Sequence, residues 1–545
     1  MSDRDLAARG RRWAVATPHS AATEAAAEIF GAGGNAIDAA VTAAVTLAVV
    51  YPHMCGVGGD LFALVQEPDG QAIAVNSSGA APEGIDVDAV RRAFSSMPER
   101  GPLTITVPGA VAGWAAVLAE GGTIPWARAF DAAIAFATDG MEVARSLAST
   151  LSSGAEEFRR DPGMRRVFYA DGDAPRAGSS VRQSALGATL RAIAQGGPNA
   201  FYGGETGSRY AAGLRSAGSP IAPTDLEAHR AEIAAPLVGR YRDLDLRVVP
   251  PNSQGFVLLE ILAAIERIGI DPDPLAADAG AMARLFRSAS SDRDRHNADP
   301  RVERVPVAAL VDDGHIAAIV DEAREDLRVA SSERATAPPS SVGSAAVGDA
   351  ESSPSGDTIA LVTADGDGRA VSLIQSLYNG FGSGILEPDT GIVAHNRGAC
   401  FTLDPSSKNV LAGRKRPAHT LMPVLVHRGS ELVAVCGTMG GAAQPQINAM
   451  SVLRLFDLGL TPAAAMRAAR WLVGGMDREG RRRFAVAERS VPERAVHALR
   501  TAGFEVDVAP DLADEVGHAQ AIRVASDGTL EAATDPRADG SAAAG

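Results

Sequence analysis

One segment without a hydrophobic pattern divides this sequence into two parts of different character. Ser331–Asp357 is rich in Ser, Ala, Pro and Gly and contains almost no large apolar residue. Such a composition cannot bury enough surface to offset chain entropy, so we expect a mobile linker here. The linker leads directly into a strand pattern that begins at Thr358. The junction between Asp357 and Thr358 is therefore the first place to look for function.

The two parts differ in their predicted secondary structure. Before the linker, Ala-rich helical patterns alternate with short strands. After it, Thr358–Thr363 and Arg369–Gln375 flank a turn of Asp and Gly residues, which predicts a β-hairpin. Helical patterns follow over Gln446–Leu458 and Thr461–Leu472. A threonine is common in strands, so Thr358 on this pattern alone is an ordinary strand residue.

Charge and motif content exclude several classes of protein. Acidic residues outnumber basic ones by 66 to 51, and a net charge of −15 disfavours nucleic acid as a partner. The chain has two lysines, Lys408 and Lys415, and no phosphate-binding GxxxxGK[ST] motif. The glycine-rich Gly56–Gly59 follows a helix and opens a strand, the reverse of a dinucleotide-binding loop.

The sequence predicts neither a metal site nor a membrane span. No HExxH or other close pairing of His with carboxylates occurs, and three scattered cysteines form neither a disulfide framework nor a CxxC site. The longest apolar run, Ala39–Tyr51, is shorter than the roughly 20 residues that a membrane helix needs. The first residues lack the apolar core of a secretory signal. We therefore expect a soluble, cytoplasmic protein.

Several segments, in order and over nearly the whole chain, resemble the γ-glutamyltranspeptidase family. They are GAGGNAIDAAVTAAVTLAVVYPHMCGVGGDLFALV (31–65), VPGAVAGW (107–114), NAFYGGETG (199–207), VVPPNSQG (248–255), GDTIALVTADGDGRAVSLIQSLYNGFGSGILEPDTGI (356–392), RKRPAHTLMP (414–423), GTMGGAAQPQ (437–446) and TDPRADG (534–540).

This resemblance implies a fold and a mode of activation. The fold is the α/β, four-layer αββα sandwich of N-terminal-nucleophile hydrolases. The precursor cuts itself between Asp357 and Thr358, so that 1–357 becomes a large-subunit region ending in the linker, and 358–545 a small-subunit region. The two regions are expected to interlock as one unit. Cleavage creates a free α-amine on Thr358, which titrates near ~7.7–8 and can take the proton of the adjacent hydroxyl.

The resemblance also implies the rest of the catalytic machinery. Gly440 and Gly441 match the glycine pair that forms the oxyanion hole, where backbone N–H groups stabilise the developing negative charge. Ser376 matches a second hydroxyl near the nucleophile. No metal or organic cofactor is implied.

The substrate-binding positions depart from the family. The stretch Ser77–Pro82 lacks the arginine that usually binds the substrate α-carboxylate. Tyr378 replaces an asparagine, and Cys400 replaces the aspartate that holds the substrate amine. His419 and Thr420 replace a pair of serines. Arg397 offers an alternative partner for a carboxylate, since a guanidinium binds carboxylate through two parallel hydrogen bonds.

The leading interpretation is therefore a γ-glutamyltransferase-like, autoprocessed threonine hydrolase or acyltransferase with an altered acyl pocket. The expected partners are a small acyl substrate with a carboxylate and the two fragments of the same precursor. One alternative is a carbon–carbon bond hydrolase acting on a keto acid in a biosynthetic pathway. Another is a non-catalytic binding protein on the same fold.

Overall fold

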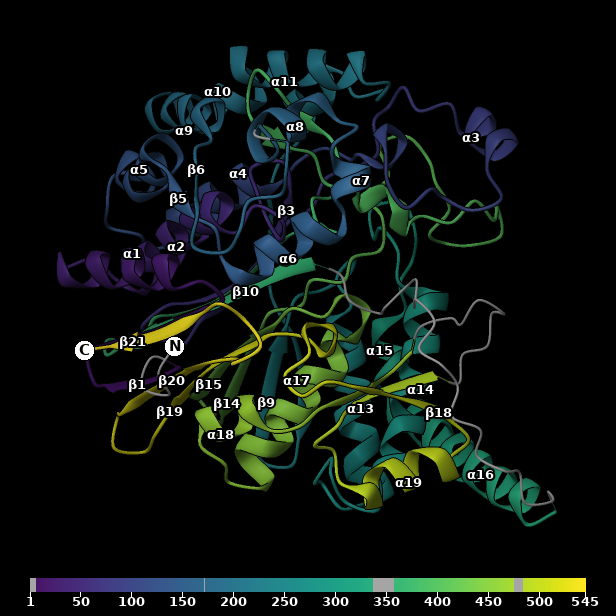
Figure 1. Cartoon of the computed structure of the whole chain (residues 1–545). Coiled ribbons are helices and arrows are strands. Elements are labelled where there is room, and N and C mark those ends of the chain that lie inside the picture. Colours follow the sequence, from purple (N-terminus) through teal and green to yellow (C-terminus); the bar gives the residue numbers. More distant parts are fainter. Residues whose placement is uncertain (1–5, 171, 337–356, 475–483) are drawn as a thin grey trace.

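The computed structural model describes residues 6–170, 172–336, 357–474 and 484–545, with the main chain alone for 330–336. In these residues, two seven-stranded antiparallel sheets lie face to face between two layers of helices (Figure 1). This arrangement confirms the expected αββα sandwich.

Each sheet combines strands from before and after residue 357. The first sheet has the order β21 (Ser541–Ala544), β2 (Trp13–Thr17), β10 (Asp357–Asp365), β11 (Ala370–Tyr378), β3 (Asp60–Gln66), β4 (Ala72–Ser77) and β7 (Glu232–Ala234). The second has the order β1 (Ala7–Gly10), β20 (Leu530–Thr534), β19 (Ala519–Val524), β15 (Glu431–Thr438), β14 (Val424–Arg428), β9 (Leu244–Val248) and β8 (Leu237–Tyr241). The expected hairpin is β10 and β11, at the centre of the first sheet.

The central strands are buried on both faces, which explains their nearly continuous apolar sequences. In β10, Ile359 and Leu361 pack against the helices, whereas Ala360 and Val362 pack between the sheets. Side chains alternate along a strand, so Thr358 shares the inter-sheet face with Ala360. The predicted nucleophile thus lies at the end of the layer between the two sheets.

One helical layer covers the first sheet (Figure 1). Its helix α2 starts with a capping box, in which the Asn35 side chain accepts from the Asp38 N–H and Asp38 accepts from the Asn35 N–H. The helices on this side of the molecule are α1 (Ser20–Gly31), α2 (Ala36–Val50), α3 (Val87–Ala93), α4 (Ala110–Ala119), α5 (Asp131–Asp139), α6 (Arg145–Ser153), α7 (Ala155–Phe158), α8 (Pro162–Phe168), α9 (Ser184–Gly196), α10 (Asn199–Tyr202), α11 (Glu205–Ser216) and α12 (Pro223–Ala228).

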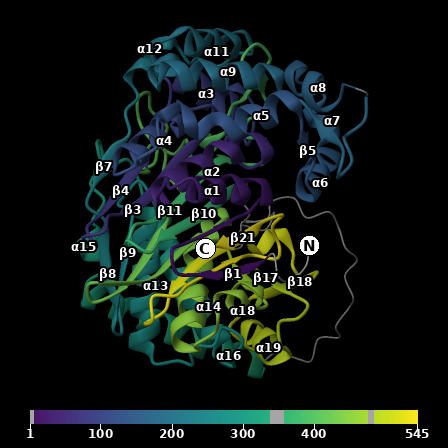
Figure 2. The ribbon, with the colours of Figure 1, turned by 90° about the vertical axis from the view of Figure 1, so that its left-hand side faces the viewer.

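A second helical layer covers the other sheet (Figure 2). Its helices are α13 (Gly255–Ile268), α14 (Ala279–His296), α15 (Val307–Leu310), α16 (Asp313–Thr336), α17 (Gln444–Val452), α18 (Pro462–Arg467) and α19 (Glu493–Thr501). The small sheets are β5 (Met141–Glu142) with β6 (Ser180–Val181), β12 (Leu386–Glu387) with β13 (Ile392–Val393), and β16 (Trp471–Val473) with β17 (Phe484–Glu488) and β18 (Glu505–Ala509). Among the helices of the described ranges, none is long and apolar enough to cross a membrane.

Two expectations about secondary structure need correction. The predicted linker starts at Ser331, but α16 continues to Thr336, because Glu333 and Arg334 favour helix more than the Ser-rich composition suggests. Residues 337–356 of the linker lie outside the described residues. The helix expected over Thr461–Leu472 ends at Arg467, and Trp471–Val473 is a strand paired with β17. Here tertiary pairing overrides the local pattern.

Candidate active site

The junction between Asp357 and Thr358, where the sequence predicts cleavage, lies at an irregular point of the central hairpin. Thr358 pairs with Ser376 of β11, and Asp357 pairs with Tyr378, with a register shift between the two pairs. Tyr378 has a φ of 81°, a left-handed conformation that is unusual for a residue with a side chain. A bulge of this kind disturbs regular pairing and re-aims side chains near active sites. The main chain is therefore distorted at the bond predicted to be cut.

Ser376 connects the predicted nucleophile to the peptide bond that precedes it. Its hydroxyl lies 2.9 Å from Thr358 Oγ1 and donates to the Asp357 carbonyl oxygen at 2.8 Å. It also accepts from the Tyr378 N–H at 2.8 Å. Thr358 and Ser376 are each only 1% exposed. The two hydroxyls and the Asp357 carbonyl thus form one buried, hydrogen-bonded group.

Arg397 lies beside this group in a short 3₁₀ turn and is fully buried. Its guanidinium donates to Thr420 Oγ1 at 3.1 Å and to Ser376 Oγ at 3.5 Å. The guanidinium carbon stands 4.3 Å from the centre of the Tyr378 ring, and Nη1 is 3.7 Å from Cys400 Sγ. The structure therefore brings four of the predicted site residues, Ser376, Tyr378, Cys400 and Thr420, around the guanidinium of Arg397.

The charge on Arg397 is balanced by the carboxylate of Asp60, a residue for which the sequence predicted no role. Asp60, the buried first residue of β3, has Oδ2 at 3.9 Å from Arg397 Nε and 3.0 Å from His419 Nε2. His395 Nδ1 lies 3.5 Å from the same oxygen. Burial favours the neutral form of Asp60, but its contacts with His395, His419 and Arg397 outweigh this effect and lower its pKa, Arg397 acting as a permanent cation and His419 through a hydrogen bond.

The two histidines of this cluster are held neutral. Burial, with Arg397 as a second cause, lowers the pKa of His419 to about 3, and burial lowers that of His395. His419 uses both ring nitrogens within the protein, since Nδ1 accepts from the Leu421 N–H at 3.3 Å. His419, predicted to bind substrate, therefore orients Asp60 in this structure. Arg397 remains the cation of the site, and its Nε has no hydrogen-bond acceptor among the described residues.

The loop predicted to form the oxyanion hole, Gly440–Ala442, is held through its carbonyl groups by the side chains of Gln254 and Arg293. Gln254 donates to the carbonyls of Gly441 at 2.9 Å and Thr420 at 2.6 Å. Arg293 donates to the Ala442 carbonyl at 2.8 Å. Because Gln254 contacts both carbonyls, it ties the loop of the glycine pair to the segment that carries Thr420.

Both glycines have backbone conformations that favour glycine, with φ of 143° at Gly440 and 52° at Gly441. A Cβ on Gly440 would come within 2.5 Å of Ile447 Cδ1. In the described chain, the N–H groups of Gly440 and Gly441 donate to no other main-chain group. Neither N–H group is therefore used in main-chain bonding among the described residues, as the predicted oxyanion hole requires.

The stretch that lacks the family arginine is closely packed. Gly79 donates its N–H to Asp60 Oδ1 at 3.0 Å, and a Cβ there would overlap the Val107 carbonyl. Ser78 is buried, and its hydroxyl donates to Asn76 Oδ1 at 2.8 Å. This part of the site therefore holds Asp60 in place and offers no cation.

Asp60, His395, Gln254 and Arg293 were missed by sequence reasoning. Asp60 directly follows the Gly56–Gly59 loop, within the segment 31–65 that resembles the family, and His395 is two residues before Arg397. A charged residue at the start of an otherwise apolar strand was the one available signal. Gln254 and Arg293 are far from the glycine pair in the sequence, and only the folded structure brings them into contact with its loop.

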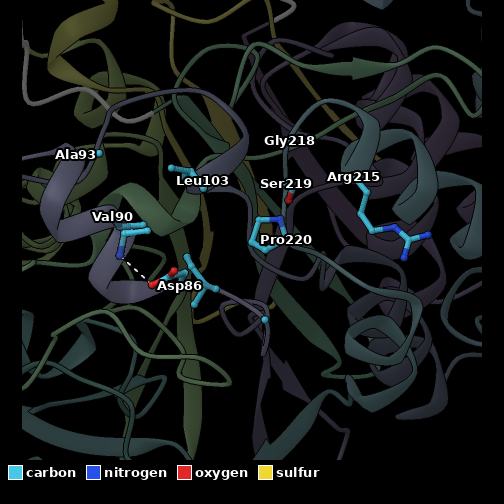
Figure 3. Close-up of a pocket in the computed structure, with 11 residues that line it drawn as sticks. Asp86, Val90, Ala93, Leu103, Arg215, Gly218, Ser219 and Pro220 are labelled. Atoms are coloured by element: carbon cyan, nitrogen blue, oxygen red, sulfur yellow. Dashed lines mark hydrogen bonds between the residues drawn. The ribbon is translucent and has the colours of Figure 1, made fainter.

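A separate cavity of about 410 Å³ lies between α3 and the 218–220 loop (Figure 3). Val90, Leu103 and Pro220 line it, and Arg215 extends away from them. None of the predicted site residues borders it. The predicted site residues therefore do not form part of this cavity.

Comparison with known proteins finds relatives that match nearly the whole chain. The family model described as "Gamma-glutamyltranspeptidase" matches residues 22–545. The oxamate amidohydrolase proenzyme of Klebsiella pneumoniae is 38% identical over 96% of this chain and 97% of its own length. The glutathione hydrolase-like YwrD proenzyme of Bacillus subtilis is 35% identical over 98% of both chains. The crystal structure of cephalosporin acylase from Bacillus halodurans superposes with a TM-score of 0.88 at 31% identity, covering 100% of this chain and 98% of that one.

Proposed function

Because this chain belongs to the γ-glutamyltranspeptidase family, and is thus an enzyme of the N-terminal-nucleophile hydrolase class, we propose that it cuts itself before Thr358 and then hydrolyses amides through that residue. The relatives are named as proenzymes, which supports synthesis as an inactive precursor. The observation that carries the proposal is the hydrogen-bonded group of Thr358, Ser376 and the Asp357 carbonyl.

Self-cleavage follows from this group by an N-to-O acyl shift. Thr358 Oγ1 attacks the Asp357 carbonyl carbon, while the Ser376 hydroxyl stabilises the carbonyl oxygen. The peptide C–N bond breaks, its nitrogen gains a proton, and Asp357 becomes an ester on Thr358. Water then hydrolyses the ester. The products are a carboxylate on Asp357 and a free α-amine on Thr358.

The mature amine would act as the general base for turnover. It takes the proton from Thr358 Oγ1 as this oxygen attacks a substrate amide, and it returns the proton to the leaving amine or ammonia. Gly440 and Gly441 would hold the oxyanion of each tetrahedral intermediate. Water, activated by the same amine, releases the acyl group as an acid.

The Asp357 side chain gives the uncut chain a pH-dependent stability. Burial raises the pKa of Asp357 to about 6, so the folded precursor favours the neutral carboxyl. The associated stability is complete below the usual pKa of 3.8 and is lost as pH rises through 6. In the uncut Thr358→Ala chain, Asp357→Asn should therefore raise Tm at pH 8 more than at pH 5, by the equivalent of about 1.4 kcal/mol.

Thermal unfolding at the two pH values measures this effect. Asp367→Asn, in the exposed turn after the same strand, is the matched control and should show no such difference. An equal change in Tm at both pH values for Asp357→Asn would contradict the assignment.

For the substrate, we propose an amide whose acyl part carries a carboxylate and no amine. The buried Arg397 offers a bidentate partner for that carboxylate. Cys400 stands where the family has an aspartate for the substrate amine, and its thiol is beside the guanidinium. A substrate ammonium there would meet the Arg397 guanidinium and find no carboxylate of its own, and an unpaired buried charge costs several kcal/mol. Oxamate, in the name of a 38% identical relative, is an acid of the proposed class.

A substrate panel tests this proposal directly. Ammonia or amine release should be measured with oxamate, a glutaryl amide, γ-glutamyl-p-nitroanilide and a keto acid with a hydrolysable carbon–carbon bond. We expect an amine-free amide to exceed the γ-glutamyl compound in kcat/KM by about 100-fold or more, the equivalent of ~3 kcal/mol. Efficient γ-glutamyl turnover would overturn the substrate proposal, and carbon–carbon cleavage without amide cleavage would overturn the reaction.

A further inference from the structure

Three helices of the second helical layer bring ligand atoms of a kind typical for metals close together. Glu260 lies on α13, Asp292 on α14 and His315 in the first turn of α16. One ligand atom from each residue lies within 4.8 Å of the others. His315 Nε2 is 2.8 Å from Asp292 Oδ2, and Arg295 Nη1 lies 3.8 Å from the other Asp292 oxygen.

The burial of the Glu260 carboxyl group is not explained by the contacts around it. Glu260 is fully buried, and neither of its carboxyl oxygens has a hydrogen-bond partner among the described residues. Buried polar groups are almost always hydrogen-bonded, because an unpaired one has a large desolvation cost. Burial, and after it Asp292, raise the pKa of Glu260 to about 9. A helix core with this side chain unpaired is less stable than one with an apolar residue in its place.

We propose that Glu260, Asp292 and His315 bind a divalent transition metal of the zinc type. Zinc binds one imidazole nitrogen and two carboxylate oxygens readily, with bonds of about 2.0–2.2 Å, and it neutralises both carboxylates. Tetrahedral ligands at these lengths are roughly 3.4 Å apart. Small side-chain rotations would widen the 2.8 Å between His315 Nε2 and Asp292 Oδ2 and shorten the longer spacings, which are at most 4.8 Å. A water molecule completes four-coordination. The unpaired Glu260 oxygens then have a partner.

The position of this cluster suggests a structural role behind the active site. Arg293, next to Asp292, holds the Ala442 carbonyl, and Gln254, directly before α13, holds the Gly441 carbonyl. A metal that joins α13, α14 and α16 therefore fixes the supports of the glycine loop. It also anchors the start of α16, the last helix before the proposed cut among the described residues. The three ligands come from distant parts of the sequence, which is why no metal motif was found there.

Metal titration of the full-length protein, prepared without a histidine tag and stripped with chelator, tests the proposal. Wild type should bind one equivalent of Zn²⁺ per chain by elemental analysis, and its Tm should rise by at least about 2 °C with excess metal. Co²⁺ in the same site should give a visible d–d absorption band. Glu260→Gln and His315→Ala should each weaken Zn²⁺ binding at least ~10-fold and abolish the Tm rise.

Two comparisons keep the test decisive. His497→Ala removes an exposed histidine of α19 and should bind Zn²⁺ as wild type does. His315 is only half-buried, so its variant should fold even if the Glu260 variant does not, which far-ultraviolet circular dichroism checks. The proposal is overturned if stripped wild type binds neither Zn²⁺ nor Co²⁺ stoichiometrically, or if a folded His315→Ala protein binds as tightly as wild type.

Discussion

Thr358→Ala is expected to leave the 545-residue chain uncut and to reduce amide hydrolysis by at least about 10⁴-fold. Removing the hydroxyl removes the attacking atom of both self-cleavage and turnover. Without cleavage, the α-amine that serves as the base never forms, so the two losses reinforce each other. A denaturing gel and intact mass spectrometry should show one band and one mass. Wild type should show two fragments, the smaller beginning Thr-Ile-Ala-Leu.

Thr363→Ser is the matched control for this experiment. Thr363 is also a buried threonine of β10, and its hydroxyl donates to the Ala36 carbonyl at 2.7 Å. The control should cleave and turn over normally, and Thr358→Ser should retain part of both activities, since a serine hydroxyl can make the same attack. A wild-type chain that stays whole yet hydrolyses substrate would rule out the proposed mechanism.

Arg397→Ala should lower kcat/KM for a carboxylate-bearing amide by about 100- to 1000-fold. A bidentate contact between a buried guanidinium and a carboxylate is lost, and its removal typically costs 2–5 kcal/mol. The substrate carboxylate would also meet Asp60, now without its cation. Self-cleavage should change much less, because Ser376 accepts from the Tyr378 N–H as well as from Arg397. Steady-state kinetics and the rate of precursor loss measure the two effects separately.

A neutral amide without a carboxylate provides the internal control for Arg397. Its slow hydrolysis should fall far less in the variant than that of the acidic substrate, which separates recognition from general damage. Arg397→Lys keeps the charge but loses the planar fork, and should recover only part of the activity. Unchanged kinetics of Arg397→Ala on the best substrate would show that another group binds the carboxylate.

The order of motifs along the chain was enough to predict the fold and the identity of Thr358, Ser376, Gly440 and Gly441 as candidates. The local pattern alone was not enough to identify Thr358, because threonine is common at the start of a strand. The resemblance supplied the reason to consider it, and the structure places its hydroxyl within hydrogen-bond distance of Ser376.

The remaining part of the site depended on contacts between distant segments. Asp60 and His419 are far apart in sequence, and their 3.0 Å contact arises only when β3 and the segment before β14 are packed together. For the same reason, the orientation of His419 toward Asp60, rather than toward the pocket, could not be read from its position in a motif. The end of the helix at Arg467 was likewise set by the pairing of Trp471 with β17.

The central location of β10 affects how the mature enzyme can be assembled. Its neighbours are β2, which precedes the proposed cut, and β11, which follows it, so the N-terminus that this cut creates would lie inside a sheet shared by both fragments. Before the cut, these strands meet by closing a loop within one molecule. After it, unfolded fragments must find each other by a bimolecular encounter, at a rate set by their concentration. Folding therefore has to precede cleavage, and denaturation of the cut enzyme becomes much harder to reverse than denaturation of its precursor.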